Sequence, residues 1–425
     1  MSVKEKVWSM LREAIAVNER SFPWERAVGA GLSMALPIFI GLWLGQLQYG
    51  LIAGLGGFTY LYAFRLPYAH LSKRIFFVGA SIVLASFLGS ISSPYPVAVA
   101  IIMGLISAVM LFIFNALKFI GPSSIFFVLI FALTADMPEV GLSGALFRAG
   151  LVALGATLSW TIAMSGFLIN PHRPEIQTLR RAYRQLMKLT ESVGTSHFQH
   201  EKYLAMAAFK EVEETLMAGE LPWSPSETYT RLLHLALEGN EYLLYLVNRY
   251  ADEKEALPKE AMLFLEKVDQ ELKHNLKTVT ELNVPTLPDQ KLTRHFEKMK
   301  VALKHPIHDL KPITLERRYT VFDILGNAFD RNSLVFITAL RFGVITTIAA
   351  LVAHSFDFTR SYWIPLSCVA IMSGATMVAT FHRALQRSIG TLIGIIIASS
   401  ILYFKPSGYP IAFFILFFTA VTELC

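Results

Sequence analysis

Residues 362–394 read YWIPLSCVAIMSGATMVATFHRALQRSIGTLIG, and this stretch decides the fold. An apolar segment without charges (361–381) leads into a basic turn (382–387), and a second apolar segment, rich in small residues, follows at once. Each apolar segment approaches the ~20 residues that a helix needs to cross a bilayer. The stretch therefore predicts two membrane-spanning helices joined by a short cationic turn.

A weaker copy of this unit lies at residues 46–91, where a basic segment again separates two apolar ones. Arg26 precedes the first copy and Arg341 the second. Arg26 and Arg74 are 48 residues apart, and Arg341 and Arg387 are 46 residues apart. We interpret the two copies as one internal repeat.

The repeated unit resembles the core of the fusaric acid resistance protein family. That family includes aromatic-acid efflux pumps of bacteria and has the plant malate channels as distant relatives. The resemblance is carried by Trp363-Ile364-Pro365, by His382-Arg383 with Arg387, and by Gly390-Thr391 with Gly394. The first copy departs from the motif, with Phe77 at the position of Gly390. The order of parts, a membrane block, a helical soluble block and a second membrane block, is similar over nearly the whole chain. The resemblance implies an inner- or plasma-membrane exporter of small aromatic or other organic acids.

The composition indicates a membrane protein. Of the 425 residues, 54% are hydrophobic and 16% are charged, whereas about a quarter of a soluble protein is charged. The net charge of +6 divides into +4 for residues 1–170, −1 for 171–332 and +3 for 333–425. The positive excess thus lies beside the membrane spans, where it sets their orientation. A nucleic-acid-binding surface would concentrate it on the soluble part, so we exclude nucleic acid as a partner.

The predicted fold class is all-α, a polytopic membrane protein with two repeated transmembrane blocks flanking a cytoplasmic helical bundle. An amphipathic N-terminal segment (1–26) lies at the cytoplasmic interface or packs on the soluble domain. A six-helix block (27–170), a helical bundle with a linker (171–332) and a second block of about four helices (333–425) follow. The spans are expected at about 27–46, 47–64, 75–91, 96–117, 119–135, 144–169, 333–353, 361–381, 388–404 and 409–425.

The distribution of basic residues predicts the orientation. Lys and Arg fall on alternate turns of the first block, so its two ends, and with them the N-terminus and the bundle, are expected in the cytoplasm. Residues 1–19 carry charges throughout and contain no apolar signal core, so no cleaved signal peptide is expected. The expected location is the plasma (inner) membrane of a bacterium. Because the second block holds four of the six spans that the repeat predicts, we expect it to be incomplete, by about 60 residues or more.

The sequence contains no catalytic signature. It lacks a Gly-x-Ser-x-Gly turn, a His-Glu-x-x-His pair and a phosphate-binding loop. His305, His308 and Asp309 have neither a cysteine nor a second cluster at ligand spacing, so they are interpreted as a solvated loop. We therefore predict no enzymatic activity, no cofactor and no metal.

Arginines in and beside the spans are the candidates for a substrate path, because a charge at the bilayer centre costs ~3 kcal/mol or more and usually serves function. Arg148 and Arg341 are predicted to face an internal cavity and attract an organic anion. The alternative is that they reach an interface or pair with acidic residues of the loop 136–139. Arg383 and Arg387 form either an anion ring at the cytoplasmic mouth or contacts with phospholipid.

Proton coupling requires a titratable group that both sides of the membrane can reach. The candidates in the second block are Glu423, His354 and Asp357.

The predicted function is export of small organic anions such as aromatic carboxylic acids, driven by the proton gradient. A passive organic-anion channel and a non-transporting scaffold for envelope assembly are the alternatives. The partners considered are the organic anion, the lipid bilayer, a second copy of the chain through the small-residue helix faces, and an accessory envelope protein.

Overall fold

The computed structural model describes residues 24–64, 66–119, 121–219, 227–250, 257–276, 283–304, 320–356, 360, 362–372, 377–404 and 407–423. These residues form helices and their connections, and none of them is in a strand. The predicted N-terminal amphipathic segment and the loop with His305 and His308 lie outside the described residues. The chain divides into two compact units, one of residues 1–64, 74–163 and 319–425 and the other of residues 65–73 and 164–318.

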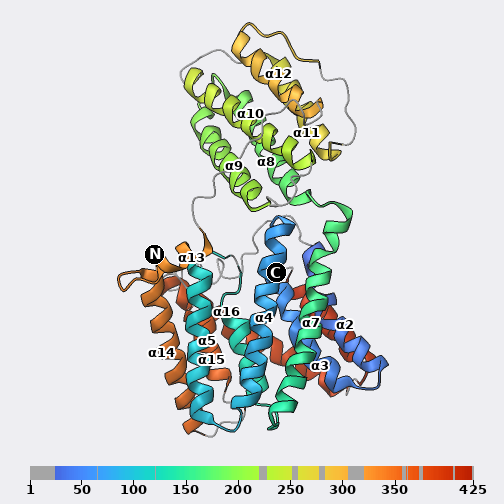
Figure 1. Ribbon diagram of the computed structural model, residues 1–425, viewed down its shortest axis with the longest axis vertical. Helices are drawn as coiled ribbons and strands as arrows, with labels where there is room; N and C mark the ends of the chain where they lie inside the picture. Colours follow the sequence, from blue (N-terminus) through green and yellow to red (C-terminus); the bar gives the residue numbers. More distant parts are fainter. Residues whose placement is uncertain are drawn as a thin grey trace, which may run out of the picture. The chain divides into compact units, whose positions relative to one another are not determined.

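The first unit contains most of the residues of the membrane-spanning helices (Figure 1). Among the described residues, six helices are long and apolar enough to cross a bilayer, and three shorter helices are also apolar. The long ones are α2 (Trp24–Trp43), α4 (Tyr68–Ser92), α5 (Pro96–Ala116), α7 (Leu142–Ile169), α14 (Leu334–Ser355) and α16 (Met377–Tyr403). The short ones are α6 (Ile125–Ala135), α15 (Trp363–Met372) and α17 (Tyr409–Thr422). The prediction of a polytopic all-α membrane protein is confirmed.

Two predicted spans of the first block are not continuous α-helices. The span at 47–64 is the nine-residue helix α3 (Leu47–Leu55) followed by the 3₁₀ helix η1 (Gly56–Tyr62). The span at 119–135 is helical only as α6, because Gly121 and Ser123 have φ of +145° and +49° and Pro122 between them has no N–H for a helix. Pro122 therefore precedes its helix, whereas the sequence placed it inside a span.

The basic segment of the second block is helix and not a turn. Helix α16 begins at Met377 and runs through residues 382–387 to Tyr403 without a break. The residues Ala384, Leu385, Gln386 and Arg387 are all strong helix formers, and neither Gly nor Pro interrupts the helix before Gly390. The corresponding basic residues of the first block, Lys73 and Arg74, also lie inside a helix, α4.

The two membrane blocks pack on each other through two pairs of helices. The first helix of the second block, α14, packs on the fourth α-helix described in the first block, α5. The first helix of the first block, α2, packs on the last described helix of the second block, α17. Figure 1 shows α14 in orange beside the teal α5.

The residues at these two interfaces correspond at a constant offset. A Cβ on Gly343 would lie 2.9 Å from the carbonyl oxygen of Gly104, and a Cβ on Gly31 would lie 2.8 Å from that of Leu416. Gly343 follows Gly31 by 312 residues, and Leu416 follows Gly104 by the same number. The hydroxyls of Ser107 and Thr346 lie 3.3 Å apart, and the Thr419 hydroxyl lies 3.6 Å from the Met34 sulfur, again at an offset of 312.

This offset corrects the alignment of the repeat that the arginines suggested. At 312 residues the counterpart of Arg26 is Thr338 and not Arg341. Arg26 is the third residue of α2, whereas Arg341 lies two turns inside α14. The two arginines are therefore not equivalent.

The described residues of the second unit form a bundle of five amphipathic helices. They are α8 (Arg173–Ser192), α9 (Phe198–Gly219), α10 (Glu227–Arg249), α11 (Lys259–Lys273) and α12 (Gln290–Lys304). The apolar residues that the sequence spaced for helices are buried in its core, among them Leu179, Tyr183, Leu265 and Phe296. After the bundle, α13 (Val321–Ala328) begins with a capping box between Thr320 and Asp323, and all its apolar residues stay unburied. The described residues of this part of the chain are thus mostly helical, in agreement with the all-α fold class, and the domain bounds 171–332 stay a prediction.

Candidate functional site: a cavity and an ion pair at opposite ends of the membrane unit

A cavity of about 160 Å³ lies where helices of the two blocks meet. Its lining comes from α5 and the end of α6 in the first block, and from the end of α14 and the start of α15 in the second. Ala100, Met103 and Ala350 form part of its apolar wall. The arrangement follows from the packing of α5 on α14, which brings the blocks together beside it.

Polar side chains gather at this cavity. Asp136, the C-cap residue of α6, and His354, in the last turn of α14, both line it and are exposed. Tyr362, which precedes α15, and Ser93, which follows α4, add two hydroxyls. The cavity therefore combines an apolar pocket with groups that can exchange protons and donate hydrogen bonds to a carboxylate.

An ion pair joins the two blocks at a second place. The guanidinium of Arg26, in the first turn of α2, lies 2.9 Å from the carboxylate of Glu423, which caps the C-terminal end of α17. Arg26 also donates a hydrogen bond of 3.2 Å to the carbonyl of Leu61 in η1. Side-chain exposure is 32% for Arg26 and 16% for Glu423, so the pair is partly shielded from water. Charge-assisted bonds in such a setting are stronger than neutral ones.

Aromatic rings hold the arginines at this end. The Arg26 guanidinium lies 4.3 Å from the centre of the Phe64 ring. Arg74 of α4, which is 4% exposed, lies 5.3 Å from the same ring and 4.7 Å from that of Phe119. Cation–π contacts of this kind fix the direction of a guanidinium.

The cavity and the ion pair lie at opposite ends of α4. Arg74 is near the start of α4, and its guanidinium contacts the Phe64 ring, as that of Arg26 does. Ser93, which lines the cavity, directly follows the last residue of α4. At about 1.5 Å per residue the two positions are roughly 28 Å apart, close to the thickness of the bilayer core. One site therefore belongs to each side of the membrane.

The arginines predicted to face an internal cavity do not come together. Arg148 lies in α7, is half-buried, and donates a hydrogen bond of 2.8 Å to the carbonyl of Pro138 in the loop before that helix. Arg341 lies on an exposed position of α14. No contact among the described residues links the two, and neither lines the 160 Å³ cavity.

The remaining predicted residues divide between the two sites. His354 lies in the cavity and Glu423 in the ion pair. Glu423 was expected about fifteen residues inside a span, but α17 ends at Thr422 and the carboxylate is at the helix end. Arg383 and Arg387 are in α16, where Arg387 is half-buried, and the side chain of Arg383 lies outside the described residues, as does Asp357.

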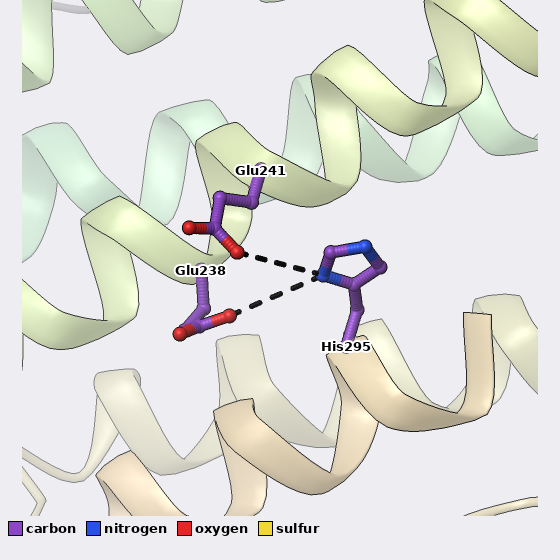
Figure 2. Close-up of side chains that lie close together, drawn as sticks. All are labelled: Glu238, Glu241 and His295. Atoms are coloured by element: carbon purple, nitrogen blue, oxygen red, sulfur yellow. Dashed lines mark ion pairs between the residues drawn. The ribbon is translucent and has the colours of Figure 1, made fainter. Parts of the chain in front are cut away.

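A separate group of ionisable side chains lies in the helical bundle. Figure 2 shows Glu238 and Glu241 of α10 pointing toward His295 of α12, with 4.0 Å from each carboxylate to the imidazole Nδ1. The ammonium of Lys298 lies 3.3 Å from Glu238 and 2.9 Å from Glu241. The two carboxylates and the imidazole are close enough together to bind a metal ion, but Lys298 already supplies a positive charge to both carboxylates.

Protonation states agree with an ion-pair cluster. The hydrogen bond to Glu241 raises the pKa of Lys298, so the ammonium stays charged. Burial, and next the charge of Lys298, lower the pKa of His295, so the imidazole is neutral at pH 7. The cluster is therefore assigned to the packing of α10 on α12.

Sequence reasoning missed two functional candidates. Asp136 was seen only as a loop charge, and Arg26 only as a marker of the repeat. His354, which lines the same cavity as Asp136, and Glu423, the ion-pair partner of Arg26, are 218 and 397 residues away in the sequence. No local spacing connects residues at such separations. The signal available was that each is a charged residue at the end of an apolar span.

Comparisons with known proteins agree with the architecture. The model of the family described as fusaric acid resistance protein-like matches residues 348–425. The "Uncharacterized membrane protein YvaC" of Bacillus subtilis (strain 168) is 33% identical over 426 residues, which cover 99% of this chain and 67% of the relative. The "Uncharacterized protein YhfK" of Escherichia coli (strain K12) is 34% identical over 95 residues, 22% of this chain and 13% of that protein. No solved structure gives a significant match.

Proposed function

Because this chain belongs to the fusaric acid resistance protein-like family of membrane proteins, we propose that it exports small organic anions, aromatic carboxylic acids among them, driven by the proton gradient. The observation that carries the proposal is the cavity between the two blocks. Transporters built from repeats bind substrate where the repeats meet. The protein acts in this proposal as a transporter and not as an enzyme.

The size and lining of the cavity suit one aromatic ring. Its volume is about 160 Å³, and a cavity of about 150 Å³ in another protein holds benzene. The apolar wall at Met103 and Ala350 would contact the ring. The hydroxyl of Tyr362 and a protonated His354 would donate hydrogen bonds to the carboxylate.

The acidic residue at the cavity couples substrate and proton. A carboxylate substrate and an ionised Asp136 repel each other, so both are not held there at once as anions. Binding of the substrate anion therefore favours the protonated form of Asp136, and departure of the anion favours its ionisation. In this proposal Asp136 and His354 link the occupation of the cavity by the anion to the protonation of its side chains.

We place the protein in the bacterial plasma membrane with its N-terminus and helical bundle in the cytoplasm. The positive-inside distribution of Lys and Arg supports this orientation. The cavity then opens toward the outside and the Arg26–Glu423 pair lies at the cytoplasmic end. A second copy of the chain or an accessory envelope protein is compatible with this arrangement.

The test is the accumulation of a labelled benzoate in cells that lack or express the protein. Expression is expected to lower accumulation, and an uncoupler is expected to abolish the difference. The variants His354→Gln and Asp136→Asn should each reduce export at least about tenfold, since each removes a group needed in the cavity.

Arg341→Gln is the matched control, because Arg341 lies on a span but outside the cavity. Export that persists with an uncoupler would support the passive channel. Unchanged accumulation over a panel of aromatic and aliphatic acids, with the protein present in the membrane, would contradict the proposal.

A further inference from the structure

The two interfaces between the blocks are equivalent in construction. Each is formed by the first helix of one block and the fourth of the other, α2 on α17 and α14 on α5. In each, a glycine of the first helix lies against a backbone carbonyl of the other, Gly31 against Leu416 and Gly343 against Gly104. Two blocks that are joined by two such equivalent interfaces can separate at one interface while they pivot about the other.

The interfaces differ at the end where α2 and α14 begin. At α2–α17 this end is joined by the ion pair of Arg26 and Glu423. The 312-residue offset places the uncharged Thr338 and Leu111 at the corresponding positions of α5–α14.

Aromatic rings close the α5–α14 interface instead. Phe112 of α5 contacts Phe336 of α14 and Phe329, which follows α13, with ring centres 6.5 and 5.9 Å apart. Phe329 and Phe336 are themselves 4.9 Å apart. Apolar contacts of this kind do not depend on the charge of any group, whereas an ion pair is lost when either charge is removed.

We propose that the Arg26–Glu423 ion pair holds α2 against α17 in one state of the transport cycle, and that this interface opens while the α5–α14 interface stays closed. The inference rests on the proposed transport function. Arg26 is a positioning residue, since its guanidinium acts by holding Glu423 and is itself held by the Leu61 carbonyl and the Phe64 ring. When the pair breaks, these two contacts keep Arg26 at the cavity-distal end, ready to bind again.

Matched disulfides test which interface moves. In a variant with Cys368 and Cys425 replaced by Ser, Met34→Cys with Thr419→Cys links α2 to α17, and Ser107→Cys with Thr346→Cys links α5 to α14. The two pairs occupy equivalent positions, with facing side-chain atoms 3.6 and 3.3 Å apart. Oxidation of the first pair is expected to abolish export and a reductant to restore it, whereas oxidation of the second pair leaves export unchanged.

A second measurement needs no substrate. The rate of disulfide formation is followed for both cysteine pairs in the full chain, with and without Glu423→Gln. Loss of the charge should slow formation at 34–419 about tenfold, since a hydrogen bond to a charged group is lost. The rate at 107–346 should not change. Exchange of the charges, Arg26→Glu with Glu423→Arg, should restore the rate at 34–419.

The outcomes separate this inference from the transport function. Equal rates at 34–419 with and without Glu423→Gln would overturn the inference whatever the protein transports. Loss of export on locking either interface, or only α5–α14, would also overturn it. Slowing confined to 34–419 without export of any tested acid would support the inference and count against the proposed substrate class.

Discussion

At the scale of the residue, burial of Glu175 gives the helical bundle a pH-dependent stability. Glu175 lies in the first turn of α8, is 3% exposed, and has one carboxylate oxygen without a hydrogen-bond partner among the described residues. Burial raises the pKa of this carboxyl from 4.5 to about 7. The folded state therefore holds the proton more tightly than the unfolded state, and stability falls as the pH rises from about 4.5 to about 7.

Glu175→Gln should remove this dependence. The amide keeps the shape of the protonated side chain without its charge, so the variant should be more stable at pH 8 by up to about 3 kcal/mol, and by under about 1 kcal/mol at pH 5. The measurement is thermal unfolding of the full chain in detergent at both pH values. Glu214→Gln, an exposed carboxylate of α9, is the control and should change neither value. Parallel pH profiles for wild type and Glu175→Gln would contradict the assignment.

Single residues were predictable from the sequence where the bilayer constrains them and not where distant contacts do. A proton-driven carrier needs a titratable group in or beside a span, and this requirement selects His354 and Glu423 from the sequence. The cost of a charge inside an apolar span selects Arg341 as well, but the structure has Arg341 at an exposed position. What separates these cases is the helix that packs beside each residue, and hydropathy contains no information on that helix.

At the scale of the element, long apolar helices were predictable and short or broken ones were not. The helices α5, α7 and α14 follow their predicted spans closely, because a segment of about 20 apolar residues satisfies its backbone hydrogen bonds in lipid by forming a helix. The end of a helix beside Gly121 and Pro122 depends on a few backbone angles, and hydropathy averages over them. The sequence predicts a turn at the basic segment 382–387 because charges usually lie outside spans, whereas its helix-forming residues favour the continuous helix that the structure has.

Close packing of α5 on α14 can be tested by adding one methyl group. A Cβ on Gly104 would lie 1.9 Å from the Thr347 hydroxyl and 2.6 Å from the carbonyl oxygen of Gly343. Gly104→Ala should therefore force the helices apart and cost about 1–3 kcal/mol of stability. Thermal unfolding in detergent measures the loss.

Gly150→Ala is the matched control for this substitution. It makes the same change in α7, where a Cβ would meet no atom within 4 Å. Alanine is the better helix former by about 1 kcal/mol, so this variant should be as stable as the wild type or more so. Equal losses for the two variants would show that α5 and α14 do not pack at Gly104.

At the scale of the whole molecule, the proposed orientation predicts which positions a reagent reaches from outside the cell. Glu139, in the loop before α7, and Lys210, on α9 of the bundle, are both exposed. In the variant without native cysteines, Glu139→Cys should react with a membrane-impermeant maleimide in intact cells. Lys210→Cys should react only after the cells are permeabilised. The reverse pattern would invert the topology and place the cavity on the cytoplasmic side.

The repeat was detectable in the sequence, but its geometry was not. Two weakly similar segments predict two related blocks, but they do not indicate which helix of one block contacts which helix of the other. The structure pairs α2 with α17 and α14 with α5, so that each block supplies the other with a packing partner. The cavity and the ion pair both result from this exchange, which is why the sequence pointed to individual residues of the two sites and not to the sites themselves.

The packing of α2 on α17 also determines when the membrane unit can complete its folding during synthesis. Helix α2 ends at Trp43 and its partner α17 begins at Tyr409, so at about 5–20 residues per second the ribosome needs on the order of half a minute to deliver the partner. During that interval α2 is already made, but the face that carries Arg26 and Gly31 has no α17 to pack against. A newly made first block is thus an unfinished intermediate, and its quality control in the cell must tolerate an arginine without its carboxylate until translation of the second block supplies one.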